Sequence, residues 1–195
     1  MFTDIYLSST NYIKGNTCAQ IWTNDIEWIK IKPISTKSHG NHSDKKLFKD
    51  DDVLSTIVTD GAREQVIGKF KEACQDATVQ VQHLEYNTLW ENRAEGAMRE
   101  NKRSARRAMK KSACPEKLWD YCAELQAKIR CHTAQDIPTL NVQVPKTVVI
   151  GNTKYISELV ECGWYQWVYY RDATTSFLLR EEELGKYLGP YGNVG

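Results

Sequence analysis

The order of strand-like and helix-like segments constrains the fold of this chain more than any other feature of its sequence. Three segments within the first 34 residues alternate apolar and polar side chains, and only short polar stretches separate them: residues 2–7, 17–23 and 26–34. Such alternation is typical of strands that bury one face. Three strands joined by short connections predict an antiparallel meander at the start of the chain.

Strands and helices then alternate. A β-branched strand pattern, a helical pattern, a second strand pattern and two further helical patterns follow in turn, at residues 53–59, 63–77, 78–85, 89–111 and 115–133. A weak helical pattern at residues 43–49 precedes them. Three strands followed by strands that alternate with helices are the order of a ribonuclease H-like fold. We therefore expect an α/β (α+β) protein whose mixed sheet is flanked by helices.

The last third of the chain differs in composition. From about residue 136 glycine, proline, tryptophan and tyrosine become more frequent, and short strand patterns occur at residues 165–172 and 175–184. We expect three parts: a core at residues 1–135, a connector at residues 136–156, and a small β-barrel-like domain at residues 157–195.

The stretch of residues 89–111 concentrates positive charge that the chain as a whole lacks. The formal net charge is only +1, yet seven lysines and arginines lie between residues 99 and 111. At about 100° per residue, one stripe of this helix is small and apolar: Ala94, Met98, Ala105 and Met109. The neighbouring stripe starts at Glu95 and is basic: Arg99, Lys102, Arg103, Arg106 and Lys110. A solvated surface is the ordinary explanation of a charge run, but this clustering favours an anionic partner.

Three carboxylates stand out by position. Asp4 lies inside the first predicted strand, Asp60 ends the fourth, and Glu95 lies in the first turns of the basic helix. Taken singly, each has an ordinary explanation: an edge-strand charge, a turn residue, or a helix-start acid. Together, acids from several elements can hold two Mg²⁺ ions about 3.5–4 Å apart, the arrangement that phosphodiester chemistry uses. The basic stripe beside Glu95 would then hold the backbone of a nucleic acid.

The six cysteines and four histidines show no zinc-ligand spacing and no dense disulfide framework, which predicts reduced thiols in an intracellular protein. For the pair Cys131 and His132, packing at a helix end is favoured over metal binding. No apolar run reaches membrane-spanning length, so no membrane association is expected. Asp4 interrupts the stretch where a signal peptide would be apolar.

Two motifs resemble a known family. "VTDGA" around Asp60 and "ENRAEGAMRENKR" around Glu95, with the two acids 35 positions apart, resemble the D,D-35-E integrase cores of retrotransposons, and copia-type LTR elements most closely. "FTDIYLSSTNYIKGNTCAQIWT" is similar to the first two strands of that family, with Asp4 as the first acid. The segment from "VVIGNTKYISELV" to "LGKYLGP" resembles the part after the core, so the resemblance covers almost the whole chain.

The resemblance implies a polynucleotidyl transferase that trims DNA ends of the element and joins their 3′-OH groups to target DNA. Asp4, Asp60 and Glu95 would be catalytic and would bind Mg²⁺ or Mn²⁺, with two ions expected. Residues expected to bind nucleic acid are Asn92, Arg99, Lys102, Arg103, Arg106 and Lys110. The implied partners are double-stranded DNA and further copies of the chain. The implied location is the nucleus or a retroelement particle of a eukaryotic host.

The loop before Glu95 departs from the family pattern. Tyr86 and Leu89 stand where prolines are usual, and Glu91 stands where glutamine is usual. The alternative is therefore a catalytically decayed DNA-binding remnant of a retroelement polyprotein. A ribonuclease of the same fold is a third hypothesis, which the spacing of the acids disfavours. In each case we expect a fragment of a larger polyprotein.

Overall fold

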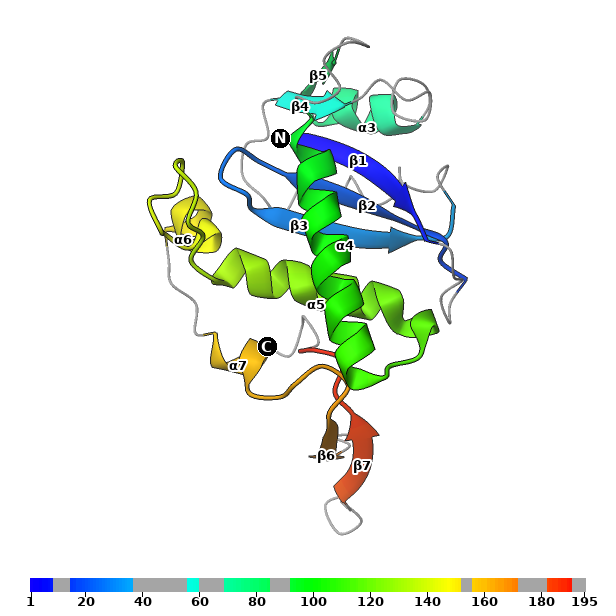
Figure 1. Cartoon of the computed structure of the whole chain (residues 1–195). Helices are drawn as coiled ribbons and strands as arrows, with labels where there is room; N and C mark the ends of the chain where they lie inside the picture. The colour runs from blue at the N-terminus through cyan, green and yellow to red at the C-terminus, as the bar shows by residue number, and fades with distance from the viewer. Residues whose placement is uncertain are drawn as a thin grey trace.

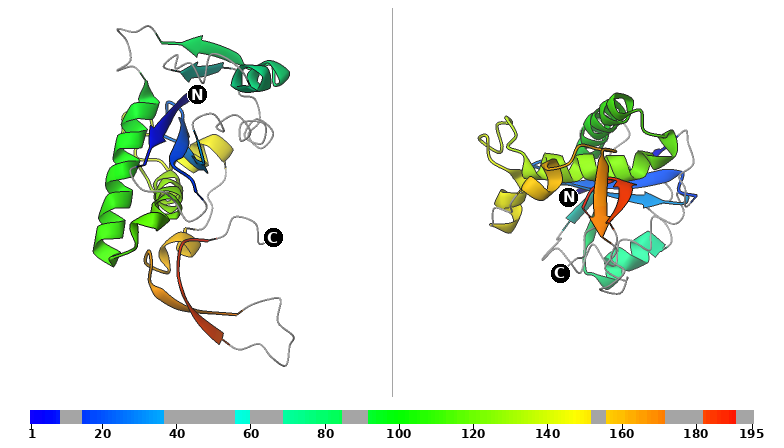
Figure 2. Two further views of the ribbon diagram at one scale, coloured as in Figure 1. Left: turned by 90° about the vertical axis from the view of Figure 1, so that its right-hand side faces the viewer. Right: turned by 90° about the horizontal axis from the view of Figure 1, so that it is seen from below.

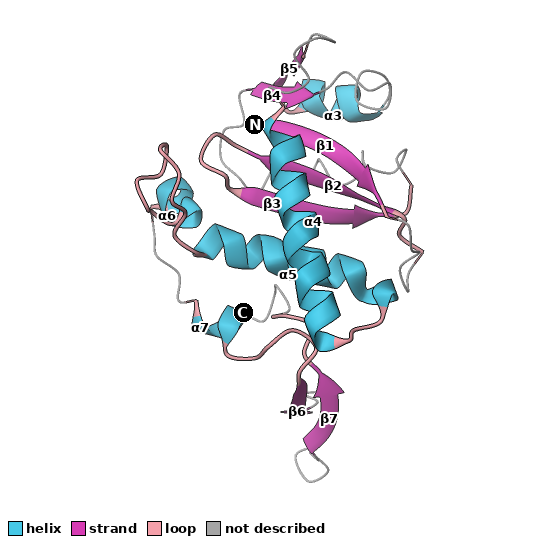
Figure 3. Ribbon diagram, viewed as in Figure 1, coloured by secondary structure: helices cyan, strands magenta, loops and turns pink. Residues whose placement is uncertain are grey.

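The computed structural model describes residues 1–8, 15–36, 56–59, 69–84, 92–151, 156–171 and 182–190 (Figures 1 and 3). The strands of the main sheet are β1 (Phe2–Leu7), β2 (Cys18–Thr23), β3 (Ile29–Ile34), β4 (Thr56–Thr59) and β5 (Gln80–His83). The helices are α3 (Lys69–Asp76), α4 (Arg93–Ser112), the 3₁₀ turn η3 (Glu116–Leu118), α5 (Trp119–His132), α6 (Pro145–Ile150) and α7 (Ser157–Val160). A separate hairpin contains β6 (Trp167–Arg171) and β7 (Glu182–Lys186).

The main sheet has the strand order β3-β2-β1-β4-β5. β1, β2 and β3 form the predicted antiparallel meander, and β4 is parallel to both β1 and β5. Phe2 of β1 is the register partner of Val58 in β4. The prediction of an α/β protein with a mixed sheet and flanking helices is therefore confirmed at this level.

Helices cover both faces of the sheet. α4 and α5 cross one another on one face, and α3 lies on the opposite face beside β4 (Figures 1 and 2). The larger core lies between the sheet and the α4–α5 pair and includes Ile21, Ile31, Ala97 and Cys122. The smaller core joins β4 to α3: Ile57, Phe70, Cys74 and Val79. β2 forms the centre of the meander, between β1 and β3, and it is buried along its whole length.

The alternation in β1 decides which side chains face α4. Asp4 and Tyr6 point to the same side because successive residues of a strand alternate between faces. Their register partners are Ile21 and Ala19, which belong to the core under α4. The strand therefore carries one acid, Asp4, and two aromatic residues, Phe2 and Tyr6, toward the helix that bears the basic stripe.

Most predicted elements form with shorter bounds. β3 begins at Ile29 and not at residue 26, because the Asn24 side chain accepts hydrogen bonds from the backbone N–H groups of Ile26 and Trp28, at 3.2 and 3.0 Å. These bonds close a turn and delay the strand. The predicted helix at residues 43–49 and the starts of the elements predicted at residues 53 and 63 lie outside the described residues.

The predicted connector packs on the core. It contains α6, which lies against α5, and both Leu140 and Pro145 are buried. Farther along, a Cβ added at Gly189 would lie 3.2 Å from the Leu125 side chain of α5. The two described strands of the tail form a hairpin that projects from the body of the protein (Figures 1 and 2). A barrel and a domain boundary in this part of the chain stay predictions.

Candidate nucleic-acid interface

Helix α4 carries the basic stripe, and its two ends are well defined. The Asn92 side chain caps the N-terminus, where its Oδ1 accepts a hydrogen bond of 3.1 Å from the backbone N–H of Ala94. The helix ends at Ala113, whose left-handed conformation directs its N–H to the carbonyl oxygens of Lys110 and Met109. Glu95 lies in the first turn, where the helix dipole favours a negative charge.

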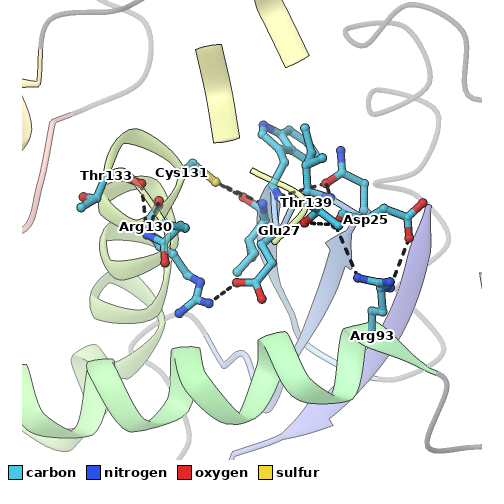
Figure 4. Close-up of polar contacts among 12 residues, drawn as sticks. Asp25, Glu27, Arg93, Arg130, Cys131, Thr133 and Thr139 are labelled. Atoms are coloured by element: carbon cyan, nitrogen blue, oxygen red, sulfur yellow. Dashed lines mark hydrogen bonds and ion pairs between the residues drawn. The ribbon is translucent and has the colours of Figure 1, made fainter. Parts of the chain in front are cut away.

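Polar contacts hold the start of α4 against the sheet (Figure 4). In the turn between β2 and β3, Asp25 pairs with Arg93 of α4 at 3.2 Å, and its carbonyl oxygen accepts a hydrogen bond from Thr139 at 3.3 Å. Glu27 in the same turn forms an ion pair with Arg130 of α5. We call these two ion pairs, Asp25–Arg93 and Glu27–Arg130, the turn latch. It ties one turn of the meander to both helices that cover the sheet.

The two stripes predicted on α4 have opposite environments. Three residues of the apolar stripe are buried, with Ala94 fully inaccessible and Met98 and Ala105 at 9% and 7% exposure, and Met109 is half-buried against the same core. The side chains of the outer stripe line a groove of about 580 Å³, which the described residues of α4 border: Glu95, Met98, Arg99, Lys102, Arg103, Arg106, Arg107 and Lys110. The five predicted cations of the helix and Glu95 therefore lie along one groove.

Lys102 connects this groove to the acid of β1. Its Nζ lies 4.6 Å from the centroid of the Tyr6 ring, a cation–π distance. Burial lowers the pKa of Lys102, the Asp4 carboxylate raises it, and Arg106 lowers it further. The ammonium thus lies in the field of Asp4 and over the face of Tyr6. Lys102 is the described residue that links the groove on α4 electrostatically to the strand bearing Asp4.

The structure describes two of the three predicted acids, Asp4 and Glu95. Asp4 lies on the sheet face covered by α4 and near Lys102, and its Oδ1 accepts a hydrogen bond of 2.7 Å from the backbone N–H of Ile5. Glu95 is exposed in the groove, two turns of helix before Lys102, which is about 10 Å of rise. Asp60 lies outside the described residues. Convergence of the three acids stays a prediction.

Asn92 has a role that the resemblance did not imply. Its side chain is 4% exposed and is used as the cap of α4. The signal was present in the sequence, because asparagine three residues before Glu95 is typical of a helix N-cap. A contact between Asn92 and nucleic acid stays a prediction.

The sequence reasoning missed two aromatic residues beside the basic stripe. Tyr6 and Trp119 meet edge to face with ring centroids 6.0 Å apart, and both border a hollow at the end of β1. Burial raises the pKa of Tyr6 well above its usual value, and the carboxylates of Asp120 and Glu124 raise it further. Strand alternation could have found Tyr6, since it shares a face with Asp4, but nothing local in the sequence pairs Trp119 with it.

No family model matches the chain, and no curated protein has a matching sequence. Among the described residues, no three His, Cys, Asp or Glu side chains gather where one metal ion could bind them all. Within the same residues, none of the helices combines the length and apolar character needed to cross a membrane.

Proposed function

We propose that this chain is the catalytic core of a copia-type retrotransposon integrase, together with part of the segment that follows the core. Its proposed activity is metal-dependent processing of DNA ends followed by strand transfer, through Asp4, Asp60 and Glu95. The observation that carries the proposal is the position of Asp4. This acid lies on a strand between β2 and β4, on the sheet face that α4 covers, and α4 carries a groove lined by cations on its outer side.

The proposed fold is ribonuclease H-like. The strand order β3-β2-β1-β4-β5 supports it, with an antiparallel meander on one side and two parallel strands on the other. A second support is that α4 follows β5 and returns across the face to which Asp4 points. A fold does not determine an activity, so the proposed activity rests on the residues of the site.

The proposed metal ligands fit the chemistry of Mg²⁺ and Mn²⁺, because both ions prefer carboxylate oxygens. Asp4 and Glu95 are the described members of the set, and each lies beside the basic stripe. When bound, two such ions would activate the attacking oxygen and stabilise the leaving oxygen. Asp4, Asp60 and Glu95 would hold them.

The proposed role of the basic stripe is to hold the DNA backbone. Cations on successive turns of one exposed helix face can follow a row of phosphates, and such contacts position DNA without reading its sequence. Lys102 differs from the other cations because it lies within the electrostatic field of Asp4. Its ammonium would contact the phosphate nearest the acids, and the neighbouring arginines would hold the flanking phosphates. We further propose that the chain acts as a homo-oligomer on two DNA ends.

The experiment that tests the proposal is an end-processing and strand-transfer assay on a labelled duplex with Mn²⁺ or Mg²⁺. Asp4→Asn, Asp60→Asn and Glu95→Gln are each expected to reduce both products below detection while leaving DNA affinity within a few-fold. Glu100→Gln is the matched control, since it removes a carboxylate from the same helix outside the groove. If Asp4→Asn, Asp60→Asn and Glu95→Gln keep full activity, as the Glu100→Gln control should, these acids do not form the site.

A second candidate is a DNA-binding remnant without catalysis. The observation that favours it is the Coulomb effect of Asp4 on Lys102, whose pKa it raises against burial, because an ammonium can balance a carboxylate without a metal ion. This candidate predicts that the chain binds DNA equally well with and without a divalent metal. It also predicts that Asp60→Asn leaves the affinity for Mn²⁺ unchanged. Calorimetric titration with Mn²⁺ separates the two candidates, because an integrase core binds the metal and loses it in Asp60→Asn.

A further inference from the structure

We propose that the hollow at the end of β1 receives one unstacked nucleotide, with its base against Trp119, beside Tyr6, and its phosphate on Lys102, Arg106 and Lys110. The inference rests on the proposed function, because the basic stripe must first bind DNA. It goes beyond that function by giving the DNA a base-binding site next to the backbone groove. The same chemistry would also admit a free mononucleotide.

The hollow has the size and lining that a nucleotide needs. Its volume is about 660 Å³, within the range of small-molecule sites. It lies between the end of β1 and the helices α4 and α5, and its lining combines two aromatic rings, three cations and one amide: Tyr6, Asn101, Lys102, Arg106, Lys110 and Trp119. Aromatic rings accept the flat face of a base, and cations accept its phosphate.

Three cations separate this hollow from the groove on the outer side of α4. Lys102, Arg106 and Lys110 border both spaces. They are spaced by four residues, so they lie on successive turns about 6 Å apart along the helix. A strand whose phosphates follow these three residues would therefore have the groove on one side and the hollow on the other. A base that leaves the stack would enter the hollow without displacing the backbone.

Two polar groups of the lining residues lack a partner. Asn101 is 2% exposed and its Nδ2 donates to the Ala123 carbonyl oxygen at 3.1 Å, but its Oδ1 has no partner in the described part of the chain. The Tyr6 hydroxyl, in a side chain 5% exposed, also has none among these residues. Buried polar groups are costly when unsatisfied. Both oxygens are themselves enclosed, so the ring N–H and amino donors of a base would reach them only when side chains of the lining move.

An acidic peptide would match the cations but not the rest of the lining. Carboxylates could pair with Lys102 and Arg106, yet they offer no flat base for the aromatic rings. The lining therefore favours a nucleotide.

The test compares two labelled duplexes by fluorescence anisotropy, without divalent metal. One has a single unpaired adenosine nucleotide, and the other has an abasic sugar at the same position. The base-bearing duplex is expected to bind about tenfold more tightly, as base–aromatic stacking would give. In Trp119→Leu the difference should disappear while the affinity for the abasic duplex remains. A 2-aminopurine at the unpaired position should lose fluorescence when the wild-type chain binds, which gives a readout that needs no variant.

Lys110→Glu and Lys111→Glu provide matched variants that leave the core intact, because both side chains are exposed and only Lys110 borders the hollow. Lys110→Glu should weaken binding of the base-bearing duplex more than Lys111→Glu does. A loss of equal size in both variants would contradict the proposed phosphate contact. If dAMP competed with the base-bearing duplex, the hollow would accept the same base and phosphate from a free nucleotide.

The outcomes separate the inference from the proposed function. Equal affinity for the two duplexes, or unchanged 2-aminopurine fluorescence, would overturn the inference and leave DNA binding in place. Absence of binding to either duplex would overturn the proposed function itself. If equal concentrations of an oligoglutamate peptide displaced the base-bearing and abasic duplexes from the chain, the chain would recognise charge alone and the nucleotide assignment would be wrong.

Discussion

The two faces of α4 show how one helix can serve packing and recognition separately. The inner face consists largely of small residues such as Ala94, Ala97 and Ala105, which are buried against the sheet and α5. Small side chains let the helix backbone approach the sheet closely, so a larger or charged residue has no room there. The outer face consists mainly of charged residues that contact solvent, so its composition is free to suit a ligand. Changes on the two faces should therefore affect different properties.

Ala105→Glu should have the largest effect on stability of any change on the two faces of α4. The substitution places a carboxylate on the inner face, at a side chain 7% exposed, and an uncompensated buried charge costs at least about 3 kcal/mol. Urea unfolding followed by circular dichroism measures the loss of unfolding free energy. Arg103→Gln is the outer-face control and should change stability by less than about 0.5 kcal/mol. Equal effects of the two substitutions would mean that the inner face is not packed as described.

Raising the pH should lower the unfolding free energy by about 2 kcal/mol through Glu124, a carboxyl on α5. Burial raises the pKa of Glu124 to about 6 from 4.5, with Lys128 lowering it, Asp120 raising it and Lys32 lowering it. A carboxyl whose pKa is raised on folding is most stabilising in its neutral form, so its contribution is complete below pH 4.5 and is lost as the pH rises through 6. Unfolding free energy measured between pH 4 and 8 should show this loss in the wild-type chain.

Glu124→Gln should remove that pH dependence, because the neutral amide does not ionise. Glu116→Gln is the control on the neighbouring 3₁₀ turn, where the carboxylate is exposed, and it should keep the dependence. A Glu124→Gln chain with an unchanged stability profile would show that another group titrates in this range.

The smallest expected effect concerns Asn92, which lies where the two faces of α4 begin. Asn92→Ala removes the cap and should lower the unfolding free energy by about 1 kcal/mol, with DNA affinity within two-fold of wild type. Thermal unfolding and anisotropy on the same samples measure both quantities. A loss of DNA affinity at unchanged stability would instead favour the contact with nucleic acid that the resemblance implies.

The elements with strong periodicity were predicted well from the sequence. Strands β1 and β2 lie within one residue of the patterns that predict them, and the buried and basic stripes of α4 follow from a period of 3.6 residues. Local backbone preferences and the burial of one face determine these strands and stripes, and both leave a pattern in the sequence. The burial of Ala94 and Ala105 could therefore be predicted before the structure was known.

The features that the sequence did not predict depend on contacts between distant residues. Leu140 and Pro145 are buried because the connector packs near α5, and no local pattern encodes that contact. The meeting of Lys102 with Tyr6 likewise needs the sheet and α4 in place. β7 extends to Lys186, beyond the segment predicted at residues 175–184, because its pairing with β6 defines it. The position of Asp60 lies outside the described residues, so the complete acid site is still a prediction.

The turn latch has a consequence for the order of events during synthesis. Its two ion pairs join Asp25 to Arg93 and Glu27 to Arg130, across about 70 and 100 residues of chain. A nascent chain that has emerged only as far as Ser112 carries all of the basic helix but lacks the second of these pairs. The surface proposed to bind DNA therefore exists in the growing polypeptide before the contacts that orient it are complete, and its final geometry waits for α5 to leave the ribosome.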